Sequence, residues 1–539
     1  MPLCVQQTDL SRIVVRLAAG CLLAAGLASV AFPQGITVPE GTFKELKEEG
    51  LGDALLIHDR QLFIDDYVID ELVGARQVLQ QPVKHPANPL IRRDRPGEQE
   101  PNSSFAYGAV LHDPRDGLFK MWYQIWQGEN PTIGVLGYAV STDGVQWEKP
   151  AIDAQTGSNL VQFDPPQPWV AGAGVLIDER ESDSGRRFKM VYLAEPTLKS
   201  ASLQTCIAYS ADGMHWRAEP ANPVIPYSDT QVTPYWDSRL SRFVAYLRFG
   251  PPNVRIISRI ESQDFLHWSN KVTVVNKSPL DGPFSTELYT MSAMPYAGAY
   301  VGVLNTYHGE TIQPIPADQP WMDRVDNQLV FSRNGVTWQR VLHDGAATAA
   351  EMQSNKDWKD EAQRATFLPY GEFQKDWDWG QIYPFHPPLV VGDEIRIYYT
   401  GMPNHHWWNY HKDEPGSGIG LATLRLDGFV AIEAADAGTL TTKPLVFFGD
   451  TLVVNADASQ GSISVEAQSV DGQPIPGFTA ADCDPLTSDS VRHVVSWKGN
   501  ADCAPLQGSP IRLVFHVKQS KLFAFEPQVR RNHYLQSYE

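Results

Sequence analysis

STDGVQW at residues 141–147 and SADGMHW at 210–216 are two copies of a motif that recurs as SQDFLHW at 262–268 and SRNGVTW at 332–338. Each copy follows an apolar stretch that is typical of a strand, and three of the four contain an Asp-Gly or Asn-Gly pair, which favours a tight turn. The tryptophan then begins the next strand. The acidic side chains of the first three copies are expected to cap these turns; they are Asp143, Asp212 and Asp264.

A second recurring strand lies upstream of each motif. It reads FKMWYQ at 119–124, FKMVYL at 188–193, FVAYLR at 243–248, YVGVLN at 300–305 and IRIYYTG at 395–401. A short turn joins each copy to a preceding apolar strand, so each unit contains three strands and implies a fourth. Repeated four-stranded units are typical of propeller blades. We therefore predict an all-β fold with a five-bladed β-propeller; an irregular array of β-sandwiches is the alternative.

The pattern changes near residue 436. From there the chain consists of short alternating strands separated by Asp, Gly and Pro turns, which indicates a β-sandwich. We expect three parts: a signal peptide at 1–34, the catalytic propeller at 35–435, and the sandwich with a C-terminal tail at 436–539. Two long loops, at 343–380 and 402–418, interrupt the propeller, and loops of this length are usually lids or binding loops.

The N-terminal segment has the features of a secretion signal. Arg12 and Arg16 precede the apolar run LAAGCLLAAGLASVAF at 17–32, and Ser29-Val30-Ala31 places small residues at the position of a cleavage site. We expect cleavage near Ala31 and a secreted or periplasmic protein. An uncleaved membrane anchor is the alternative.

The net charge of the chain limits the kinds of partner that it can bind. Its 539 residues include 63 acidic and 44 basic side chains, a formal net charge of −19. Such a chain repels the phosphates of nucleic acids and anionic membranes. No nucleic-acid or membrane partner is expected after signal cleavage, and the oligomeric state is left open. No cofactor is expected, and no EF-hand, HExxH or CxxC spacing predicts a metal site, although acidic loops leave a structural Ca²⁺ open.

Three cysteines remain after the signal segment. Cys483 and Cys503 lie in two similar turns, ADCDPL and ADCAPL, and an oxidising compartment would allow them to form a disulfide. We predict this disulfide, with two buried thiols as the alternative. Cys206 is expected to be a packed strand residue.

Four segments together resemble a known group of proteins. They are RQLFIDDYVID at 60–70, HPANPLIRRDRP at 85–96, FKMWYQ at 119–124 and GTLTTKPLVF at 438–447. This set is similar to secreted bacterial glycoside hydrolase family 32 N-terminal-like proteins, which are related in fold to families 32, 43 and 62. The resemblance implies a five-bladed catalytic propeller, a following sandwich and action on a carbohydrate. The family 32 signatures NDPNG and EC are absent, so it transfers no catalytic residues.

Position within the fold indicates candidate catalytic carboxylates. The inner strands of a propeller run in the same direction, so the residues at their N-terminal ends converge on one mouth of the funnel. Glu98, Asp229, Glu287 and Asp378 lie at or before such ends. Glycoside hydrolysis needs a carboxylic acid and a second carboxylate, and a third acid can keep the donor protonated. Glu287, beside Tyr289 and apolar strand residues, is the expected general acid, and Asp229 is the base, nucleophile or stabiliser. Each of the four carboxylates could instead cap a turn.

Aromatic and histidine side chains near the same ends are candidate sugar ligands. Tryptophan rings stack on sugar faces and imidazoles bind hydroxyl groups, although buried structural residues would give the same pattern. The candidates are Trp169, Tyr289, His308, Trp379, His386 and His405, and the loops add Trp377, Trp407 and Trp408.

These features favour a secreted glycoside hydrolase that cleaves O-glycosidic bonds of a polysaccharide or oligosaccharide with paired carboxylates. A non-catalytic carbohydrate-binding propeller is one alternative. A glycoside phosphorylase on the same fold is another, and it would need Arg, Lys and His near the acid to bind phosphate. The sugar, the linkage, the stereochemical course, and exo or endo action are left open.

Overall fold

The structure is a computed structural model, and it describes most of the chain. The described residues are 54–99, 103–128, 133–194, 203–225, 228–248, 254–278, 281, 285–309, 323–342, 345–346, 366–406 and 416–529, together with the short paired strands β1 (Ser29–Ala31) and β2 (Thr37–Pro39). These residues form β-strands and short 3₁₀ turns, which confirms the all-β prediction. Within them, no helix has the length and apolar character needed to cross a membrane.

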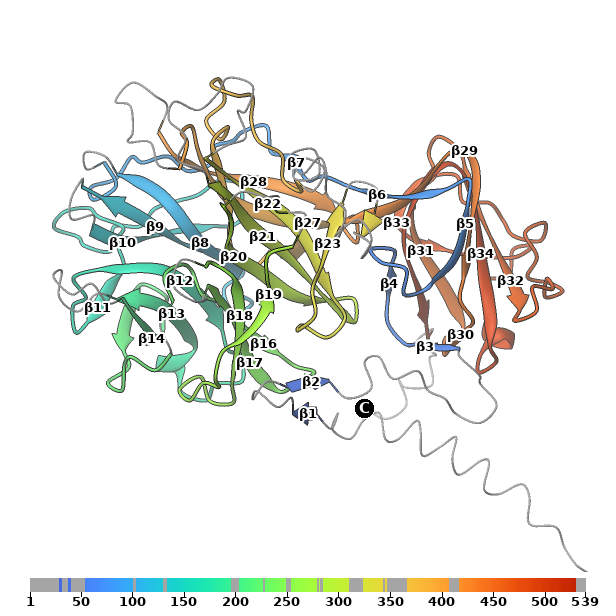
Figure 1. Cartoon of the computed structure of the whole chain (residues 1–539), viewed down its shortest axis with the longest axis horizontal. Coiled ribbons are helices and arrows are strands. Elements are labelled where there is room, and N and C mark those ends of the chain that lie inside the picture. Colours follow the sequence, from blue (N-terminus) through green and yellow to red (C-terminus); the bar gives the residue numbers. More distant parts are fainter. Residues whose placement is uncertain are drawn as a thin grey trace, which may run out of the picture.

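Five groups of mainly antiparallel strands follow one another along the chain (Figure 1). Group 1 contains β8 (Ser104–His112), β9 (Phe119–Gln127) and β10 (Ile133–Ser141). Group 2 contains β11 (Gln162–Asp164), β12 (Val170–Ile177), β13 (Phe188–Ala194), β14 (Gln204–Ser210) and β15 (His215–Ala218). Group 3 contains β16 (Thr233–Asp237), β17 (Arg242–Arg248), β18 (Ile257–Ser262) and β19 (Val272–Val275).

Groups 4 and 5 are joined in one hydrogen-bonded sheet by a short β22–β25 contact. Group 4 contains β20 (Ser285–Tyr296), β21 (Ala299–Gly309), β22 (Arg324–Ser332), β23 (Gln339–Leu342) and β24 (Gly345–Ala346). Group 5 contains β25 (Gln381–Pro384), β26 (Leu389–Val391), β27 (Glu394–Met402), β28 (Gly418–Arg425) and β7 (Val83–Lys84). β7 comes from before group 1 and pairs with β28, so an early segment of the chain completes the last group.

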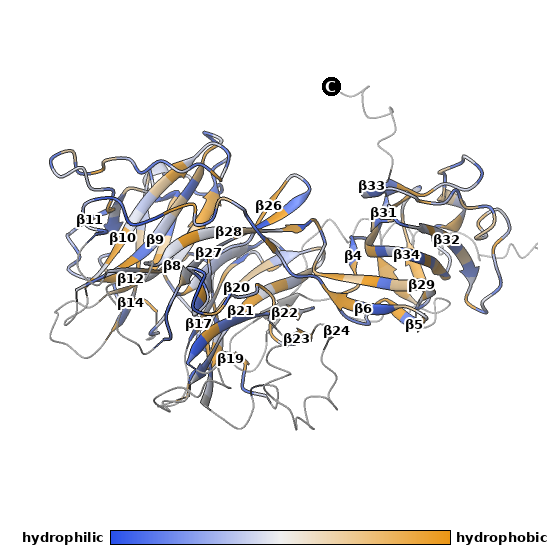
Figure 2. Ribbon diagram, turned by 90° about the horizontal axis from the view of Figure 1, so that it is seen from above, coloured by the Kyte–Doolittle hydropathy of each residue, from blue (hydrophilic) through white to orange (hydrophobic). Residues whose placement is uncertain are grey.

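The recurring second strands lie in the interior. β13 and β21 are buried along their whole described length, and β9 along most of it. A strand that is covered on both faces requires a nearly continuous apolar run, which is what FKMWYQ and FKMVYL provide. Figure 2 shows these apolar residues along the strands and polar residues in the connecting loops. Burial on both faces therefore explains the repeat that the sequence contains.

The turn motifs have the predicted structure. Asp143 Oδ1 accepts hydrogen bonds from the backbone N–H groups of Val145 (2.7 Å) and Gln146 (2.8 Å). Asp212, Asp264 and Asn334 make the same pair of contacts in the other copies. The predicted capping by the acidic residues is confirmed. In the third copy Phe265 replaces glycine and adopts a φ of 66°, a conformation that glycine takes more readily.

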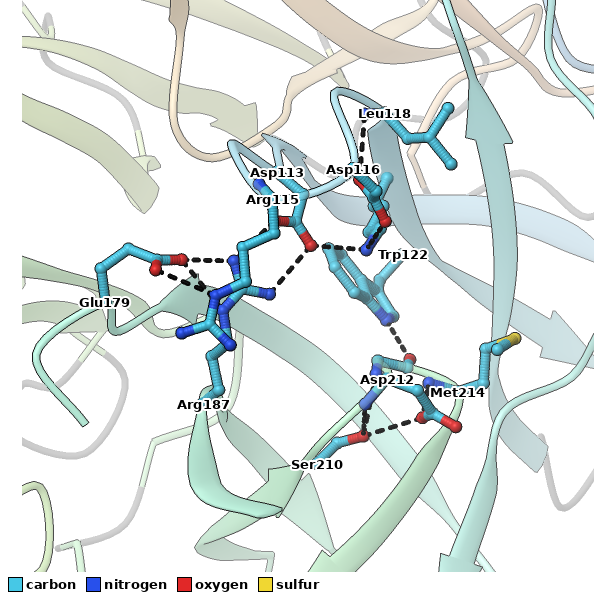
Figure 3. A network of polar contacts seen from close by, with 12 residues as sticks. Asp113, Arg115, Asp116, Leu118, Trp122, Glu179, Arg187, Ser210, Asp212 and Met214 are labelled. Atoms are coloured by element: carbon cyan, nitrogen blue, oxygen red, sulfur yellow. Dashed lines mark hydrogen bonds and ion pairs between the residues drawn. The ribbon is translucent and has the colours of Figure 1, made fainter. Parts of the chain in front are cut away.

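Aromatic side chains connect each turn to a neighbouring group. Trp122 of group 1 donates its indole N–H to the Gly213 carbonyl of group 2 (2.6 Å), as Figure 3 shows. Tyr246 of group 3 donates to Gly335 of group 4 (3.0 Å). Tyr398 of group 5 donates to Gly144 of group 1 (2.8 Å). This last contact brings the final group back against the first.

A buried charge network reinforces the contact between groups 1 and 2 (Figure 3). Asp113 accepts hydrogen bonds from Lys120 (2.5 Å) within group 1 and from both terminal nitrogens of Arg187 in group 2. Burial alone would raise the pKa of Asp113, but the hydrogen bonds from Arg187 and Lys120 hold that pKa below its usual range. Glu179 binds the opposite side of the Arg187 guanidinium.

The first strands of the groups meet through two buried polar side chains. Gln231 Nε2 donates to the carbonyls of Gly108 in group 1 (2.8 Å) and Ala173 in group 2 (2.9 Å). His386, which is fully buried, contacts the Pro234 carbonyl of group 3 through Nε2 (2.9 Å) and the Ser292 hydroxyl of group 4 through Nδ1 (3.2 Å). Together these two side chains link all five groups.

The remaining strands form a second body (Figure 2). Its sheet contains β3 (Leu55–Ile57), β4 (Gln61–Leu62), β5 (Ile69–Val73), β6 (Arg76–Leu79), β29 (Val430–Thr442), β30 (Leu445–Phe447), β31 (Thr451–Asp457), β32 (Ser462–Ser469), β33 (Asp489–Val494) and β34 (Ile511–Gln528). Phe63, Phe515 and Phe525 pack together in its core. Residues 55–79 were expected in the first domain, but here they pair with strands β29, β30 and β34.

The disulfide prediction is wrong for this structure. Cys483 and Cys503 are buried and form no disulfide with each other, and Cys206 is buried as well. Cys483 Sγ lies 3.2 Å from the Val465 amide, and Cys503 Sγ lies 3.7 Å from the Gly449 carbonyl. Each thiol is packed in the apolar core against its own backbone partner.

Gln231→Ala should destabilise the protein. The substitution removes both hydrogen bonds of Gln231, a loss of about 1–3 kcal/mol in the free energy of unfolding. The Gly108 carbonyl keeps the His386 amide as a donor (3.1 Å), whereas the Ala173 carbonyl loses the Gln231 donor. Urea unfolding measures it, with the exposed Gln460→Ala as the matched control. Equal stability of the two variants would contradict the linking role of Gln231.

His386 should make stability depend on pH. Burial lowers the pKa of His386 to about 4, whereas an unfolded histidine titrates near 6.5. Its contribution is therefore complete above pH 6.5 and is lost as the pH falls towards 4, because only the unfolded state takes up the proton. The unfolding free energy of His386→Gln should decline less steeply over this range than that of the wild type. The exposed His112→Gln is the control and should keep the wild-type slope.

Candidate functional site

Two of the predicted carboxylates lie in one cluster with two arginines and a tyrosine. Asp229 binds the Nε of Arg248, and Glu287 binds the Nη1 of Arg255. The guanidinium carbons of Arg248 and Arg255 lie 4.5 Å and 5.1 Å from the centre of the Tyr289 ring. The five side chains therefore contact one another in the order acid, guanidinium, aromatic ring, guanidinium, acid. We call these five residues the Asp229–Glu287 cluster.

Strand direction explains how this cluster forms. Asp229 precedes β16, and Glu287 and Tyr289 lie near the beginning of β20. Because β17 runs antiparallel to β16, its last residue, Arg248, returns to the end where β16 begins. Arg255 lies before β18, and its carbonyl accepts a hydrogen bond from the Leu288 amide (3.2 Å). Residues distant in sequence are therefore adjacent at one end of the first strands.

Aromatic side chains surround the cluster. Tyr107 from β8, Tyr307 from β21 and Tyr383 from β25 pack with Tyr289 in one buried group. The Tyr289 hydroxyl lies 3.1 Å from Nε2 of His406, and the Tyr307 and His406 rings lie 4.5 Å apart. The Tyr307 hydroxyl also donates to Asp323 (2.8 Å).

Burial and positive charge control the histidine beside the cluster. Burial is the largest effect on His406, and the charges of Arg255 and Arg248 add to it, so its pKa falls to about 4. His406 is therefore a neutral imidazole at pH 7. Burial raises the pKa of Tyr289 to about 12, although Arg255 and Arg248 oppose that rise. The phenol group therefore stays protonated.

The surroundings of Glu287 differ from those expected. The sequence suggested apolar neighbours that would favour the neutral acid, but the carboxylate faces the guanidinium of Arg255. The side chain of Glu287 is 15% exposed and that of Asp229 is 29% exposed, so solvent reaches both.

Glu98 lies elsewhere, in a buried network within group 1 and the segments that flank it. It accepts hydrogen bonds from the Tyr123 hydroxyl (2.5 Å) and the Asp94 amide (3.0 Å), and it forms an ion pair with Lys149 (2.7 Å). Its side chain is fully buried. This carboxylate orders the segment before β8 and is not in the Asp229–Glu287 cluster.

Asp378 is also placed apart from the cluster. It forms an ion pair with Lys84 of β7 (2.6 Å) and accepts a hydrogen bond from the Tyr399 hydroxyl (2.9 Å). Its side chain is 2% exposed. These contacts hold the early strand β7 against group 5.

Four of the predicted sugar ligands are held in the protein interior. His308 pairs with Asp326 (2.7 Å), and His386 links the first strands. Trp169 is buried against Trp126, with ring centres 5.6 Å apart. Trp379 is buried against Phe373 (4.7 Å between centres). Of the six predicted ligands, only Tyr289 lies within the cluster.

His405 and Trp377, the other described loop candidates, each pack on an aromatic ring. His405 packs on Trp379, with ring centres 4.9 Å apart. Trp377 stacks on Tyr399 (5.6 Å between centres). Trp407 and Trp408 lie outside the described residues. The described part of the chain contains no group of three or more His, Cys, Asp or Glu side chains arranged to hold a metal ion.

Sequence reasoning missed the two arginines, Tyr107 and His406. A signal for Arg248 existed, because the last residue of a second strand returns to the end where the first strand begins. Arg248 closes the recurring segment FVAYLR. No such rule finds Arg255 or His406, which lie in connecting segments and reach the cluster only through tertiary folding.

In comparisons with known proteins, the chain is similar only to solved structures. No family model matches the chain, and no curated protein matches its sequence. One similar solved structure, described as "Glycoside hydrolase", has 13% identity and a TM-score of 0.42 and covers 64% of this chain and 92% of its own. Another, described as "The GH130 family of mannoside phosphorylases contains glycoside hydrolases that target beta-1,2 mannosidic linkages in Candida mannan", has 14% identity and a TM-score of 0.41, covering 65% and 94%.

A third similar structure is an N-acetylgalactosamine deacetylase from F. plautii, with 14% identity, a TM-score of 0.41, and coverage of 66% of this chain and 97% of its own. The printed descriptions of these three proteins name different carbohydrate chemistries. Likeness at this level does not assign an activity to this chain.

Glu98→Gln should affect stability and leave turnover unchanged. The substitution removes the Glu98–Lys149 ion pair and the charged acceptor of the Tyr123 hydroxyl, a loss of about 1–3 kcal/mol in unfolding free energy. Lys149 keeps its ion pair with Asp94 (2.6 Å). Urea unfolding and glycan turnover per folded molecule measure the two effects, with the exposed Glu148→Gln as control. A loss of turnover at unchanged stability would place Glu98 in the catalytic machinery.

Proposed function

We propose that the chain is a secreted or periplasmic glycoside hydrolase that acts at the Asp229–Glu287 cluster. In this proposal the five strand groups are the blades of a five-bladed β-propeller, and the second body is a β-sandwich. One observation carries it: two carboxylates that were selected for their position at strand beginnings belong to one solvent-reached cluster. The resemblance to family 32 N-terminal-like proteins supports the same activity class.

The chemistry assigns different roles to the two acids. Cleavage of a glycosidic bond needs a proton for the leaving oxygen and a carboxylate that activates water or attacks the anomeric carbon. Asp229 is paired with the buried Arg248. It serves as the carboxylate that activates water or attacks the anomeric carbon. Glu287 serves as the proton donor once Arg255, which is 30% exposed, moves away from it.

Two alternatives make different predictions. A non-catalytic carbohydrate-binding propeller would retain glycans without releasing products. A glycoside phosphorylase requires basic side chains beside the acid, and Arg248, Arg255 and His406 lie at the cluster. That observation motivates the inference below.

Asp229→Asn and Glu287→Gln should each lower the turnover of a susceptible oligosaccharide by about 10²–10⁴-fold, because each removes a group that transfers a proton or stabilises charge. Product release from a panel of glycans measures turnover, and thermal unfolding confirms that the variants fold. The exposed Asp471→Asn, in the second body, is the control.

Wild-type turnover in both variants would contradict the site. Glycan retention by the wild type with no product from any member of the panel would instead establish the binding alternative.

A further inference from the structure

We propose that the Asp229–Glu287 cluster binds an oxyanion, a carboxylate, sulfate or phosphate group, between Arg248 and Arg255, and that this binding releases Glu287 from its ion pair. The location of the site rests on the arginines alone. The consequence for Glu287 rests on the proposed function, in which Glu287 is the proton donor.

Arg248 has donor capacity that the protein does not use. The residue is 6% exposed, and its Nη1 is buried without a hydrogen-bond partner. Asp229 contacts it only through Nε. Guanidinium groups bind carboxylates and phosphates best through two parallel N–H groups, and a buried donor without a partner is unfavourable. Arg248 is therefore a preformed but incomplete anion ligand.

Arg255 has free donors for a different reason. Its Nη1 serves both Glu287 and the Tyr289 hydroxyl (3.2 Å). Its Nε and Nη2 donate to no residue in the described part of the chain, and the side chain is 30% exposed. A ligand can therefore reach this guanidinium from solvent.

The geometry brings both guanidinium groups to the same tyrosine. The guanidinium carbon of Arg248 lies 4.5 Å from the centre of the Tyr289 ring, and that of Arg255 lies 5.1 Å from it. The ring limits their movement and supplies a hydroxyl donor at the same place. The low pKa of His406, to which both arginine charges contribute, agrees with a positive potential here.

Binding of an oxyanion would change the acid. Arg255 then shares its charge with the ligand, and Glu287 loses part of the stabilisation of its ionised form. If the ligand is free phosphate, one phosphate oxygen forms the bond to the anomeric carbon as the glycosidic C–O bond breaks. The leaving oxygen takes the proton of Glu287, and the products are a sugar phosphate and a shortened glycan. If the ligand is a substituent of the glycan, water is the nucleophile.

Binding can be measured without turnover. The full chain is titrated calorimetrically with inorganic phosphate, sulfate and glucuronate, and with glucose as the neutral control, all at one ionic strength. The wild type and the exposed Arg492→Gln variant should bind at least one oxyanion and not glucose. Arg248→Gln and Arg255→Gln should each bind it at least tenfold more weakly, and Arg248→Lys should recover part of the affinity.

The absence of oxyanion binding by the wild type, or equal binding by the arginine variants, would overturn the inference. Arg248 is buried, so Arg248→Gln could prevent folding; the partly exposed Arg255→Gln then decides the outcome.

Activity assays separate the sources of the oxyanion. Neutral glycans are tested with and without inorganic phosphate, and glycans that carry carboxylate or sulfate groups are tested without it. A sugar phosphate product identifies free phosphate as the ligand, whereas cleavage of charged glycans alone identifies a glycan substituent. Cleavage of neutral glycans at full rate with no oxyanion overturns this inference and supports the hydrolase. Oxyanion binding without any cleavage overturns the hydrolase and supports the anion site.

Discussion

The hydrogen bonds of Gln231 and His386 are the constraint on which the arrangement of the five groups depends. The first strands approach so closely that some positions admit no side chain: a Cβ on Gly174 would lie 2.0 Å from the Val232 carbonyl oxygen, and one on Gly108 2.3 Å from Phe385. The backbone carbonyls of Gly108, Ala173 and Pro234 meet there. Gln231 and His386 satisfy them across group boundaries, since a buried carbonyl without a donor is costly.

This alignment determines where the functional groups lie. Gln231 is two residues from Asp229, and the group 4 strand that contacts His386 through Ser292 also contains Glu287 and Tyr289. The side chains that join the groups and those that form the cluster therefore lie on the same short segments. A shift of one strand along its neighbour would separate the two ion pairs from the shared tyrosine.

At the Asp229–Glu287 cluster, charge is balanced one ion pair at a time. Each carboxylate has one guanidinium partner, and each guanidinium uses only part of its donor set. Elsewhere the protein pairs buried acids with two or more donors, as at Asp113 and Glu98. Asp229 and Glu287 therefore have fewer donors than Asp113 and Glu98, which leaves their carboxylate oxygens less completely bound.

The sequence by itself determined the strands, the capped turns and the all-β class, because these depend on local apolar runs and on residues close in sequence, as in STDGVQW. Its strand ends also indicated Asp229 and Glu287. It could not distinguish these two from Glu98 and Asp378, since all four precede or begin first strands. Only the tertiary structure decided which acids meet Arg248 and Arg255 and which are enclosed by Lys149 or Lys84. The thiols of Cys483 and Cys503 and the linking role of His386 were likewise decided there. Ion pairing and burial depend on which distant strand ends come together, and a local pattern carries no information about that.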